Sequence, residues 1–466
     1  MGRQHDPLLS MPDKTGVLYL RLYQRMRALI LEGSWPPGMR LPSSRRLAAD
    51  LRIARNTASL AIDQLLADGW VETRSRSGTY VSASLPQRTK IVQRTRESPH
   101  AGALPIPFEL RPGPVDCFPF ERWARIQSQV WSRSVPDLLY DPEPAGDRGL
   151  RQAIADLVLP GRGLSGTSDD VVIVNSAQSA FDLIAATVPA GSAVVVEDPG
   201  YTFADGAFAR RGLTVVPAPV DENGLDVAAA KALAPSPALI LVTPATQFPT
   251  GVPMSAERRA QLLDWARATD AWIIEEEYDV EARFDGASPQ PPLRAHDPER
   301  VITVTSFNRL LFRSLRLGFL VAPESLLEPL LKARTAVDGY IGLPQQLVLR
   351  EFIEQGAYSA HIRRSRDLFR ERRAALVAAL EPFLGGLFEP KLNPCGLHLV
   401  LRPREADIAL MVEALRDKGI ECDTMGGFTR GRHEGDALLL GFAAFSPDVI
   451  QSMRPALEYA LAPFGR

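Results

Sequence analysis

Five short runs of aliphatic residues, separated by stretches with a helical pattern, most constrain the fold of this 466-residue chain. Strands that are buried on both faces of a parallel sheet read as continuous apolar runs, and alternation with helices is typical of βαβ units. The runs are VVIV (171–174), AVVVE (193–197), LILVT (239–243), WIIEE (272–276) and VITVT (301–305). The sequence therefore predicts an α/β domain with parallel strands that begins near residue 106.

The first 82 residues have a different pattern, which predicts three helices and a hairpin. The helices are expected over 18–32, 44–51 and 55–68, because apolar residues recur in them at helical spacing. Ser43 can cap the second helix, and Gly69 is a natural terminator of the third. Residues 70–72 and 79–81 read as two short strands around a turn at 75–78.

The stretch 83–105 is polar and basic, contains Pro, Gly and Ser, and shows no periodicity, which indicates a linker. We therefore predict an N-terminal domain over 1–82, a linker over 83–105, a large domain over 106–387 and a smaller C-terminal lobe over 388–466. Residues 1–88 hold thirteen Lys and Arg against seven Asp and Glu, whereas the whole chain has a net charge of −2. A basic block joined to an acidic one suggests a nucleic-acid contact at the N-terminus.

Composition excludes several classes of protein. No apolar run approaches the roughly 18 residues that span a bilayer, and no charged-then-apolar leader opens the chain, so a cytoplasmic protein without membrane contact is expected. The three cysteines, Cys117, Cys395 and Cys422, are too scattered for a disulfide framework. The six histidines lack metal-ligand spacing, so no metal site is expected.

The N-terminal pattern is typical of a winged helix-turn-helix, in which the recognition helix enters the major groove and the hairpin contacts the backbone. Side chains suited to base edges or phosphates stand at the start of the third helix, at the start of the second and in the wing. The candidate DNA-binding residues are Arg45, Arg55, Asn56, Thr57, Arg76 and Gly78. The alternative is a small helical domain with a solvated arginine face.

The stretch LILEGSWPPGMRLPSSRRLAADLRIARNTASLAIDQLLADGWVETRSRSGTYV resembles the winged helix-turn-helix of the GntR superfamily of regulators. By position, the resemblance implies that Arg45, Arg55 and Thr57 contact DNA and that Gly78 lies at the wing tip. Ala54 departs from the family, which usually has a Ser or Thr cap there. Loss of that cap costs about 1 kcal/mol of helix stability.

Six further motifs resemble fold-type-I aminotransferases, which are fused to a GntR head in the MocR/GabR subfamily. They are YDPEPAGDRGLRQAIA (140–155), NSAQSAFDL (175–183), VEDPGYTF (196–203), TPATQFPTGVPMS (243–255), IIEEEYDVEARF (273–284) and TSFNRLLFRSLRLGFLVAP (305–323). They occur in the family order. The resemblance implies the α/β fold of pyridoxal 5'-phosphate (PLP)-dependent aminotransferases, with a smaller C-terminal α/β lobe, and a homodimer.

The resemblance also assigns roles in a cofactor or effector site, which needs a ring to stack, donors for a phosphate and a carboxylate for the ring nitrogen. Tyr201 matches the stacking aromatic residue, and Tyr278 matches the tyrosine that contacts the ring hydroxyl. Ser306 and Arg316 match the phosphate donors, since the planar arginine fork binds phosphate bidentately. Gln178 lies in a turn that enters a helix N-terminus, which favours anions.

Two decisive positions differ from the family. The family reads Ser-Phe-Ser-Lys where this chain reads Ser-Phe-Asn-Arg, so the Schiff-base lysine is replaced by Arg309, which is not a usable amine nucleophile. The aspartate that faces the pyridine nitrogen falls on Glu276, one methylene longer, and Ser176 replaces a glycine of the phosphate turn. None of the lysines lies in a motif that supplies a substitute; they are Lys14, Lys90, Lys231, Lys332, Lys391 and Lys418.

We therefore predict no catalytic residue and no covalent cofactor, although PLP can still be held without a covalent bond. Arg309 either anchors an anion or marks a pocket that lost its ligand and persists as a dimerisation scaffold. The predicted function is a homodimeric transcriptional regulator that binds a double-stranded DNA operator and senses a small anionic effector. The alternatives are an active PLP-dependent aminotransferase with a DNA-binding head and a DNA-binding dimer with no ligand.

Overall fold

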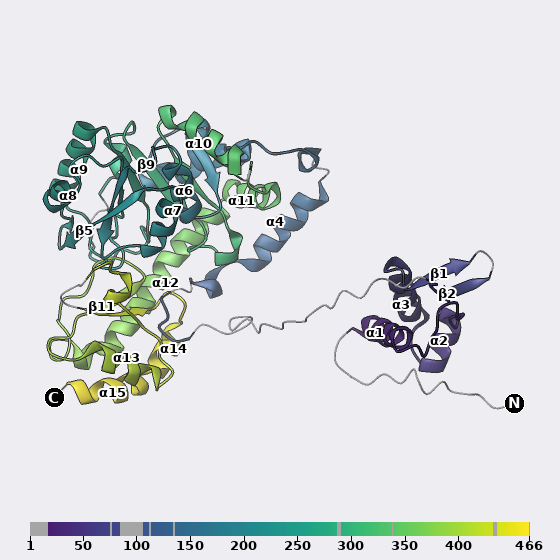
Figure 1. Ribbon diagram of the computed structural model, residues 1–466. Helices are drawn as coiled ribbons and strands as arrows, with labels where there is room; N and C mark the ends of the chain where they lie inside the picture. The colour runs from purple at the N-terminus through teal and green to yellow at the C-terminus, as the bar shows by residue number, and fades with distance from the viewer. Residues whose placement is uncertain are drawn as a thin grey trace. The chain divides into compact units, whose positions relative to one another are not determined.

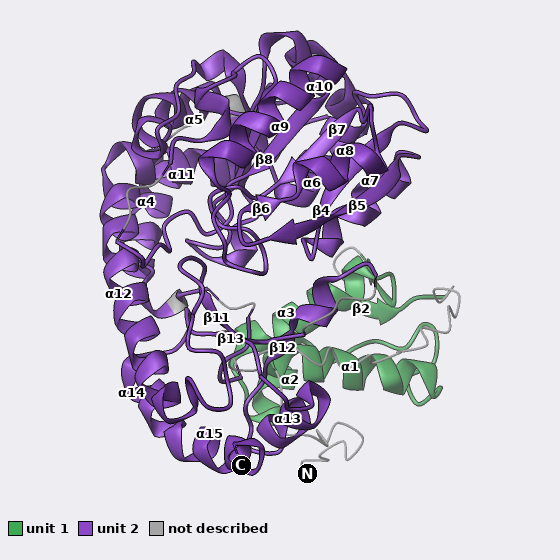
Figure 2. Cartoon of the chain, turned by 90° about the vertical axis from the view of Figure 1, so that its left-hand side faces the viewer, with its two compact units in different colours: residues 1–101 green, residues 102–466 purple. Residues whose placement is uncertain are grey.

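The computed structural model describes residues 17–74, 77–83, 106–110, 113–133, 136–286, 290–337, 339–431 and 436–465. The chain divides into two compact units, residues 1–101 and 102–466 (Figure 1, Figure 2). The boundary between the units falls within the stretch 83–105, of which only residue 83 is described. Among the helices of the described residues, none is long and apolar enough to cross a membrane.

The N-terminal unit contains three helices and a two-stranded antiparallel hairpin, as the sequence predicts. The elements are α1 (Leu18–Leu31), α2 (Ser44–Leu51), α3 (Arg55–Ala67), β1 (Val71–Arg74) and β2 (Gly78–Val81). Their apolar faces share one core, in which Leu22, Met26 and Leu65 are fully buried. Ser43 caps α2 by accepting a hydrogen bond from the Arg46 backbone N–H at 3.3 Å. The chain then turns towards α3 at Arg52, which has a left-handed backbone (φ 52°).

A mixed eight-stranded sheet forms the centre of the larger unit. Its strands are β3 (Val171–Val174), β4 (Ala193–Asp198), β5 (Thr214–Asp221), β6 (Gly224–Leu225), β7 (Leu239–Val242), β8 (Trp272–Glu276), β9 (Val301–Ser306) and β10 (Gly318–Val321). Their order across the sheet is β3-β10-β9-β8-β7-β4-β5-β6. The block β5-β4-β7-β8-β9 is parallel, as predicted, but β10 runs antiparallel to both β3 and β9, which the sequence pattern does not reveal.

Helices cover both faces of this sheet because successive strand residues point to opposite sides. Val194, Leu241 and Ile274 pack on one face with three helices, α6 (Ala177–Ala185), α7 (Asp205–Arg210) and α10 (Glu324–Val337). Val195 and Ile240 pack on the other face with α8 (Val227–Leu233) and α9 (Ala256–Thr269). Near β3 and β10 this second face is covered by α4 (Phe120–Ser132), α5 (Arg148–Ala153) and α11 (Leu343–Glu354).

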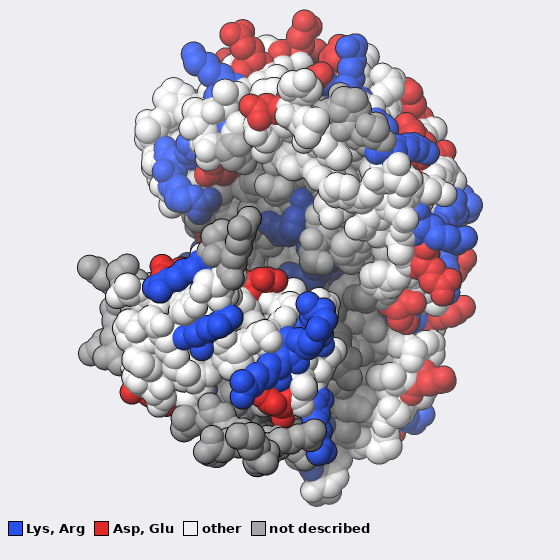
Figure 3. All heavy atoms as spheres, turned by 90° about the vertical axis from the view of Figure 1, so that its right-hand side faces the viewer, with Lys and Arg blue, Asp and Glu red and all other residues white. Residues whose placement is uncertain are grey.

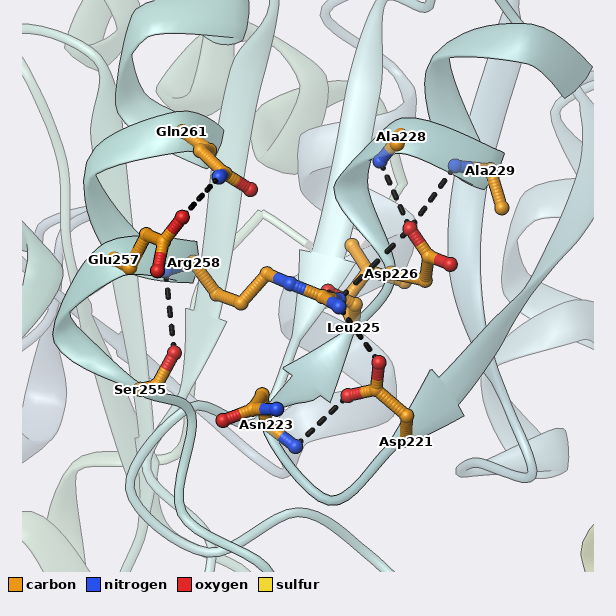
Figure 4. A network of polar contacts seen from close by, with 10 residues as sticks. All are labelled: Asp221, Asn223, Leu225, Asp226, Ala228, Ala229, Ser255, Glu257, Arg258 and Gln261. Carbon is orange, nitrogen blue, oxygen red and sulfur yellow. Dashed lines mark hydrogen bonds and ion pairs between the residues drawn. The ribbon is translucent and has the colours of Figure 1, made fainter.

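An ion-pair network ties α9 to the β5-β6 hairpin and to α8 (Figure 4). The Arg258 guanidinium, in the first turn of α9, lies 2.6 Å from the Asp221 carboxylate and donates to the Leu225 carbonyl at 2.7 Å. Asp226 caps α8 by accepting from the backbone N–H groups of Ala228 and Ala229. The network fixes the edge of the sheet that is farthest from β3.

A smaller lobe follows the long helix α12 (Ala357–Leu380), which runs from the sheet-bearing part into the lobe (Figure 1, Figure 2). Its sheet has the order β11-β13-β12, with β11 (His398–Leu401), β12 (Asp423–Thr424) and β13 (Leu438–Gly441). Its helices are α13 (Ile408–Arg416), α14 (Pro447–Ser452) and α15 (Arg454–Leu461). Leu399, Met411 and Leu457 join the same core as α4, α11 and α12, so the lobe packs firmly against the rest of the unit.

Candidate functional site

A cavity of about 400 Å³ opens at the carboxyl ends of the parallel strands of the larger unit. Open α/β sheets bind ligands at this edge, and the volume is in the range of small-molecule sites. The cavity is lined by all seven residues that the sequence nominated for a cofactor or effector: Gln178, Tyr201, Glu276, Tyr278, Ser306, Arg309 and Arg316. Residues that are far apart in the sequence therefore meet in one place.

One end of the cavity offers donors for an anion. Ser306 ends β9, Arg316 precedes β10, and the N-terminus of α6 follows β3. The strands β3, β10 and β9 are neighbours in the sheet. Asn308 holds these segments together, because its side chain donates to the Asn175 carbonyl at 3.1 Å and accepts from the Leu317 N–H at 2.9 Å. Among the described residues, no carboxylate pairs with the exposed Arg316 guanidinium. This end is therefore equipped to bind a phosphate or a carboxylate.

Ser176 has a structural role at this end. Its hydroxyl caps α6 by accepting from the Ser179 N–H at 3.2 Å, and the Ser179 hydroxyl accepts from the Ser176 N–H at 3.0 Å. This reciprocal arrangement is a capping box. A serine at this position thus stabilises the helix whose first turn lines the cavity.

Arg309 lies in the cavity, but its guanidinium is already engaged. Its Nε and Nη2 atoms donate to the two carboxylate oxygens of Asp279 at 2.5 and 3.1 Å, and its Cζ atom lies 4.9 Å from the centre of the Tyr278 ring. The Asp279 side chain is 1% exposed, and it also accepts from the Leu397 N–H. Burial lowers the pKa of Arg309, but Asp279 and Tyr278 raise it by more, so the guanidinium stays charged. A ligand anion would have to share Arg309 with Asp279.

Glu276 and Tyr278 present further polar groups to the cavity. Within the described part of the chain, the buried Tyr278 hydroxyl has no hydrogen-bond partner, and the charged side chains that act on the Glu276 carboxyl are Glu197, Asp279 and Arg309. Burial, together with the negative charges of Glu197 and Asp279, raises the pKa of Glu276 to about 8. Both groups face a cavity in which a ligand could satisfy them.

A buried ion-pair network on the cavity wall was missed by the sequence reasoning. The Arg162 guanidinium lies 3.0 Å from Glu277 and 2.8 Å from Glu281, and all three side chains are less than a tenth exposed. Glu277 also accepts from the Thr305 hydroxyl at 2.6 Å. Because Arg162 is neutralised by two carboxylates, it is not available to a ligand anion. More than a hundred residues separate Arg162 from these partners, so no local signal could have found the network.

The opposite end of the cavity is apolar and aromatic. Phe248, after β7, lies 4.9 Å from the Tyr278 ring and 4.8 Å from the Phe428 ring, measured between ring centres. Tyr201 follows β4, and its ring lies 6.4 Å from that of Phe248. Burial raises the pKa of Tyr201 to about 12, so its hydroxyl stays neutral. The sequence reasoning nominated Tyr201 and Tyr278 but missed Phe248 and Phe428.

Three further polar residues of the larger unit have internal partners. His398 is fully buried and its Nε2 atom lies 2.7 Å from the Pro249 carbonyl oxygen, so its role is structural. Arg210 and Arg211 pair with Asp182 at 3.4 and 2.5 Å rather than facing the large cavity.

The N-terminal unit exposes the predicted DNA-reading residues. Arg55 and Asn56 are exposed at the start of α3, Thr57 is half-buried beside them, and Arg45 is exposed in the first turn of α2. Lys and Arg side chains gather on the face of this unit that Figure 3 shows. Gly78 begins β2 with φ +121°, and an added Cβ would lie 3.0 Å from the Arg40 guanidinium. Arg76 lies outside the described residues.

Ala54 occupies the N-cap position of α3 and makes no side-chain hydrogen bond there, as the sequence predicts. The first turn of the recognition helix therefore leaves backbone N–H groups without a capping side chain. These groups are available to a DNA phosphate.

A winged helix-turn-helix joined to an aminotransferase-like α/β domain defines a class of DNA-binding transcriptional regulators. Residues 18–81 match the family described as "Bacterial regulatory proteins, gntR family", and residues 119–430 match "Aminotransferase class I and II". The chain belongs to the MocR-type regulators, which join these two domains.

Regulators with the same organisation are similar to the chain along most of its length. The probable rhizopine catabolism regulatory protein MocR of Rhizobium meliloti is 32% identical, with 94% of this chain and 93% of MocR covered. The pyridoxine biosynthesis transcriptional regulator PdxR of Corynebacterium glutamicum is 28% identical, with 96% of each covered. The HTH-type transcriptional regulator TauR of Rhodobacter capsulatus is 32% identical, with 79% of this chain and 81% of TauR covered.

Solved aminotransferases share the fold of the larger unit. The α-aminoadipate aminotransferase LysN of Thermus thermophilus is 22% identical with a TM-score of 0.67, covering 77% of this chain and 93% of LysN. An archaeal alanine:glyoxylate aminotransferase is 24% identical with a TM-score of 0.68, covering 77% of this chain and 91% of its own. This fold belongs to the PLP-binding aminotransferases.

Proposed function

We propose that the larger unit senses a small anionic effector and does not catalyse transamination. The observation that carries this proposal is the cavity itself. Within the described residues, it combines an Arg316 that pairs with no carboxylate, the Glu276 carboxyl and a Tyr278 hydroxyl without a hydrogen-bond partner. Arg309 lies where the resemblance expects the reactive lysine. A guanidinium held by a buried carboxylate is not a nucleophile, so a ligand here is held by non-covalent contacts alone.

The cavity residues fit PLP as a non-covalent ligand. In enzymes of this fold, bound PLP supplies an electron sink for reactions of amino acids. In this chain Ser306, Arg316 and the first turn of α6 would hold the phosphate, and Tyr201 would stack on the ring. The Glu276 carboxyl would face a ring nitrogen, and the Tyr278 hydroxyl, which has no hydrogen-bond partner among the described residues, would be satisfied by a ring hydroxyl. The residues do not fit covalent attachment.

Equilibrium dialysis of the full chain with PLP tests this proposal. We expect reversible binding that Arg316→Ala weakens at least tenfold, because the arginine fork supplies bidentate phosphate contacts. Arg370→Ala is the matched control, because Arg370 is an exposed arginine of α12 that pairs with Asp367 and lines neither the large cavity nor the smaller hollow beside it. An amino-acid-dependent conversion of the bound cofactor by the unmodified protein would contradict the proposal.

We further propose that Arg45, Arg55, Asn56, Thr57, Arg76 and Gly78 form the operator-binding face. Arg45 and Arg55 support it because both are exposed and, in the described part of the unit, neither pairs with a carboxylate. Arg46 offers a matched control, since it is also exposed but lies 3.6 Å from Asp50. We expect Arg55→Ala to weaken binding to the neighbouring intergenic DNA by about 1–3 kcal/mol, and Arg46→Ala by less.

Fluorescence anisotropy titrations at several salt concentrations would measure both variants. Binding by the unmodified protein should fall steeply with salt, because phosphate contacts release counterions. Undiminished binding by Arg55→Ala, or by a chain that lacks residues 1–82, would show that the DNA contact lies elsewhere.

We also propose that two copies of the chain associate through the larger unit. Leu139 and Tyr140 are 84% and 75% exposed, and the neighbouring Val337 and Tyr340 add to the same surface. The Tyr340 hydroxyl donates to Asp141 at 2.6 Å, which ties the two segments together. Exposed apolar clusters of this kind mark interaction sites. Val337 also lines a smaller hollow that shares Ser176 and Gln178 with the large cavity, so a second copy here would lie beside the effector site.

A further inference from the structure

A second cavity of the larger unit lies between the first half of α12 and the segment 157–162. We call it the α12 cleft. Its volume is about 170 Å³. An apolar cavity of roughly 150 Å³ in another protein holds one benzene molecule, so the cleft has room for a ligand of about that size.

The floor of the α12 cleft belongs to the buried ion-pair network of Arg162. Arg162 and Glu281 line both the cleft and the large cavity, so the two cavities share this wall. The Arg162 guanidinium also donates to the hydroxyl of the buried Tyr358 at 3.3 Å. A hydroxyl that accepts a hydrogen bond can still donate its own proton. Tyr358 therefore brings a hydrogen-bond donor to the floor of the cleft.

Two exposed arginines of α12, Arg363 and Arg366, line the cleft one helical turn apart. Among the described residues, neither pairs with a carboxylate, whereas Arg370, one turn further along, lies 3.0 Å from Asp367. Long side chains on a helix point back towards its N-terminus, which here is the side of Tyr358. The two guanidinium groups are therefore placed to bind a ligand in the cleft.

Arg366 acts on the floor of the cleft. Burial raises the pKa of Glu281, and the positive charges of Arg162 and Arg366 oppose this shift. Arg366 is thus close enough to influence Glu281, although its guanidinium forms no ion pair among the described residues.

The charges around the cleft favour a ligand with one negative charge. The network of Arg162 with Glu277 and Glu281 has one negative charge in excess, and Arg363 and Arg366 add two positive charges. A carboxylate would neutralise the remaining positive charge, and its two oxygens can accept from both guanidinium groups. A dianion would bring a second charge that no cation of this set offsets.

The wall opposite α12 is aliphatic and has an irregular backbone. Leu157 and Val158 belong to a π-helical turn, Ile154–Val158, which follows α5 directly. Turns of this kind are rare and frequently occur at functional sites. Leu157 is 49% exposed and lines the cleft, so it offers an apolar contact for the body of a ligand.

We propose that the α12 cleft is a second ligand site of the larger unit and that it takes a small organic carboxylate. Arg363 and Arg366 bind the carboxylate, the Tyr358 hydroxyl donates to it, and Leu157 packs against the body of the ligand. This site does not depend on the proposed effector site in the large cavity, with which it shares only Arg162 and Glu281.

Benzoate and benzamide form a matched pair of probes, because they have the same ring and nearly the same size but only benzoate is charged. An NMR titration of the full chain, followed on the signals of the probe, would measure both affinities. We expect benzoate to bind at least tenfold more tightly than benzamide, because only the carboxylate makes charge-assisted hydrogen bonds with the arginines.

Variants of four arginines locate the bound benzoate. Arg363→Ala and Arg366→Ala should each weaken its binding at least fivefold. Arg370→Ala is the matched control on the same helix and should leave it unchanged, because Arg370 does not line the cleft. Arg316→Ala should also leave it unchanged, because Arg316 lines only the large cavity. An unchanged thermal unfolding midpoint without benzoate would show that each variant is folded.

Three outcomes would overturn this second site. Equal affinities for benzamide and benzoate would mean that the cleft does not recognise a carboxylate. Weaker benzoate binding in Arg316→Ala, with no change in Arg363→Ala and Arg366→Ala, would place benzoate in the large cavity. If benzoate does not bind the full chain at all, the site is refuted as well. None of these outcomes refutes the proposed effector site.

Discussion

The ion pair between Arg309 and Asp279 decides what the cavity can do with a cofactor. Asp279 sits at 1% exposure with its charge matched by one guanidinium, so the pair holds a cation at the position where the resemblance places an amine. An arginine there keeps the local charge of a protonated lysine but lacks its nucleophile. We therefore predict that the replacement keeps a cation beside Asp279 and removes the covalent chemistry.

The unmodified protein incubated with PLP should therefore show no absorption band of a lysine-linked cofactor, and borohydride should fix no cofactor mass on it. Arg309→Lys should gain both signals, because Ser306, Arg316 and Tyr201 remain in place to hold the ligand. Arg46→Lys, in the other unit, is the control for non-specific lysine labelling. Absorption spectra and intact mass spectrometry would measure the outcome. A colourless Arg309→Lys protein would favour a dimerisation scaffold, and a trapped cofactor on the unmodified protein would refute non-covalent binding.

The raised pKa of Glu276 predicts that the stability of the larger unit changes with pH in a definite direction. Burial raises the pKa of Glu276 to about 8 and those of Glu197 and Glu275 to about 7. Above the ordinary glutamate pKa the folded chain holds protons that the unfolded chain has lost, so stability falls as pH rises from about 4.5 towards 8. Glu276→Gln should reduce this fall by up to about 1.4 kcal/mol per pH unit.

Urea denaturation at about pH 6 and about pH 8 would measure this difference. Glu405→Gln, at an exposed position of the lobe, is the matched control and should leave the pH dependence unchanged. An equal loss of stability between the two pH values in the unmodified and Glu276→Gln proteins would show that Glu276 is ionised in the folded state.

At the scale of the element, the recognition helix α3 begins without a side-chain cap. Ala54 has the extended backbone of an N-cap (φ −64°, ψ 140°), so a serine there needs no rearrangement to accept from the first turn. Ala54→Ser should stabilise the N-terminal unit by about 1 kcal/mol. Ser43→Ala should destabilise the same unit by a similar amount, since Ser43 already caps α2. Thermal unfolding of the isolated residues 1–82 would measure both, and no gain from Ala54→Ser would mean that the first turn is satisfied in another way.

Local signals in the sequence predicted most of these elements. Helices α1, α2 and α3 begin where predicted and end within one residue, because caps and apolar periodicity are encoded nearby. The strands β3, β4, β7, β8 and β9 coincide with the five apolar runs for the same reason. The antiparallel direction of β10 was not predictable, because it depends on pairing with strands that are distant in the sequence.

Site residues could be predicted from the sequence only where they belong to a motif of the family. The motif positions lead to Tyr201, Glu276 and Ser306, which do line one cavity. The ion pair of Arg309 with Asp279 and that of Arg430 with Asp205 depend on the packing of distant segments. In the sequence, the residues that make these contacts are isolated charged residues without a recognisable pattern.

At the scale of the whole molecule, an effector must act through its differential affinity for two arrangements of the chain. A polar linker of about 20 residues, as the sequence predicts for 83–105, would not fix the spacing of two DNA-binding heads. Association of the larger units would hold two heads at a high effective concentration over one operator, without any new contact between the heads themselves. DNA binding should therefore depend on the dimer more than on each head alone.

We expect isolated residues 106–466 to be dimeric, and isolated residues 1–82 to be monomeric and to bind DNA poorly. Sedimentation of the two fragments and anisotropy with the neighbouring intergenic DNA would measure both properties. Within the full chain, Leu139→Glu should weaken the dimer and the DNA binding together, because it places a charge on the exposed apolar surface. Leu233→Glu is the matched control, since Leu233 is 55% exposed on α8, away from that surface. A monomeric 106–466 fragment would refute the dimer, and a Leu139→Glu dimer of unchanged strength would place its interface elsewhere.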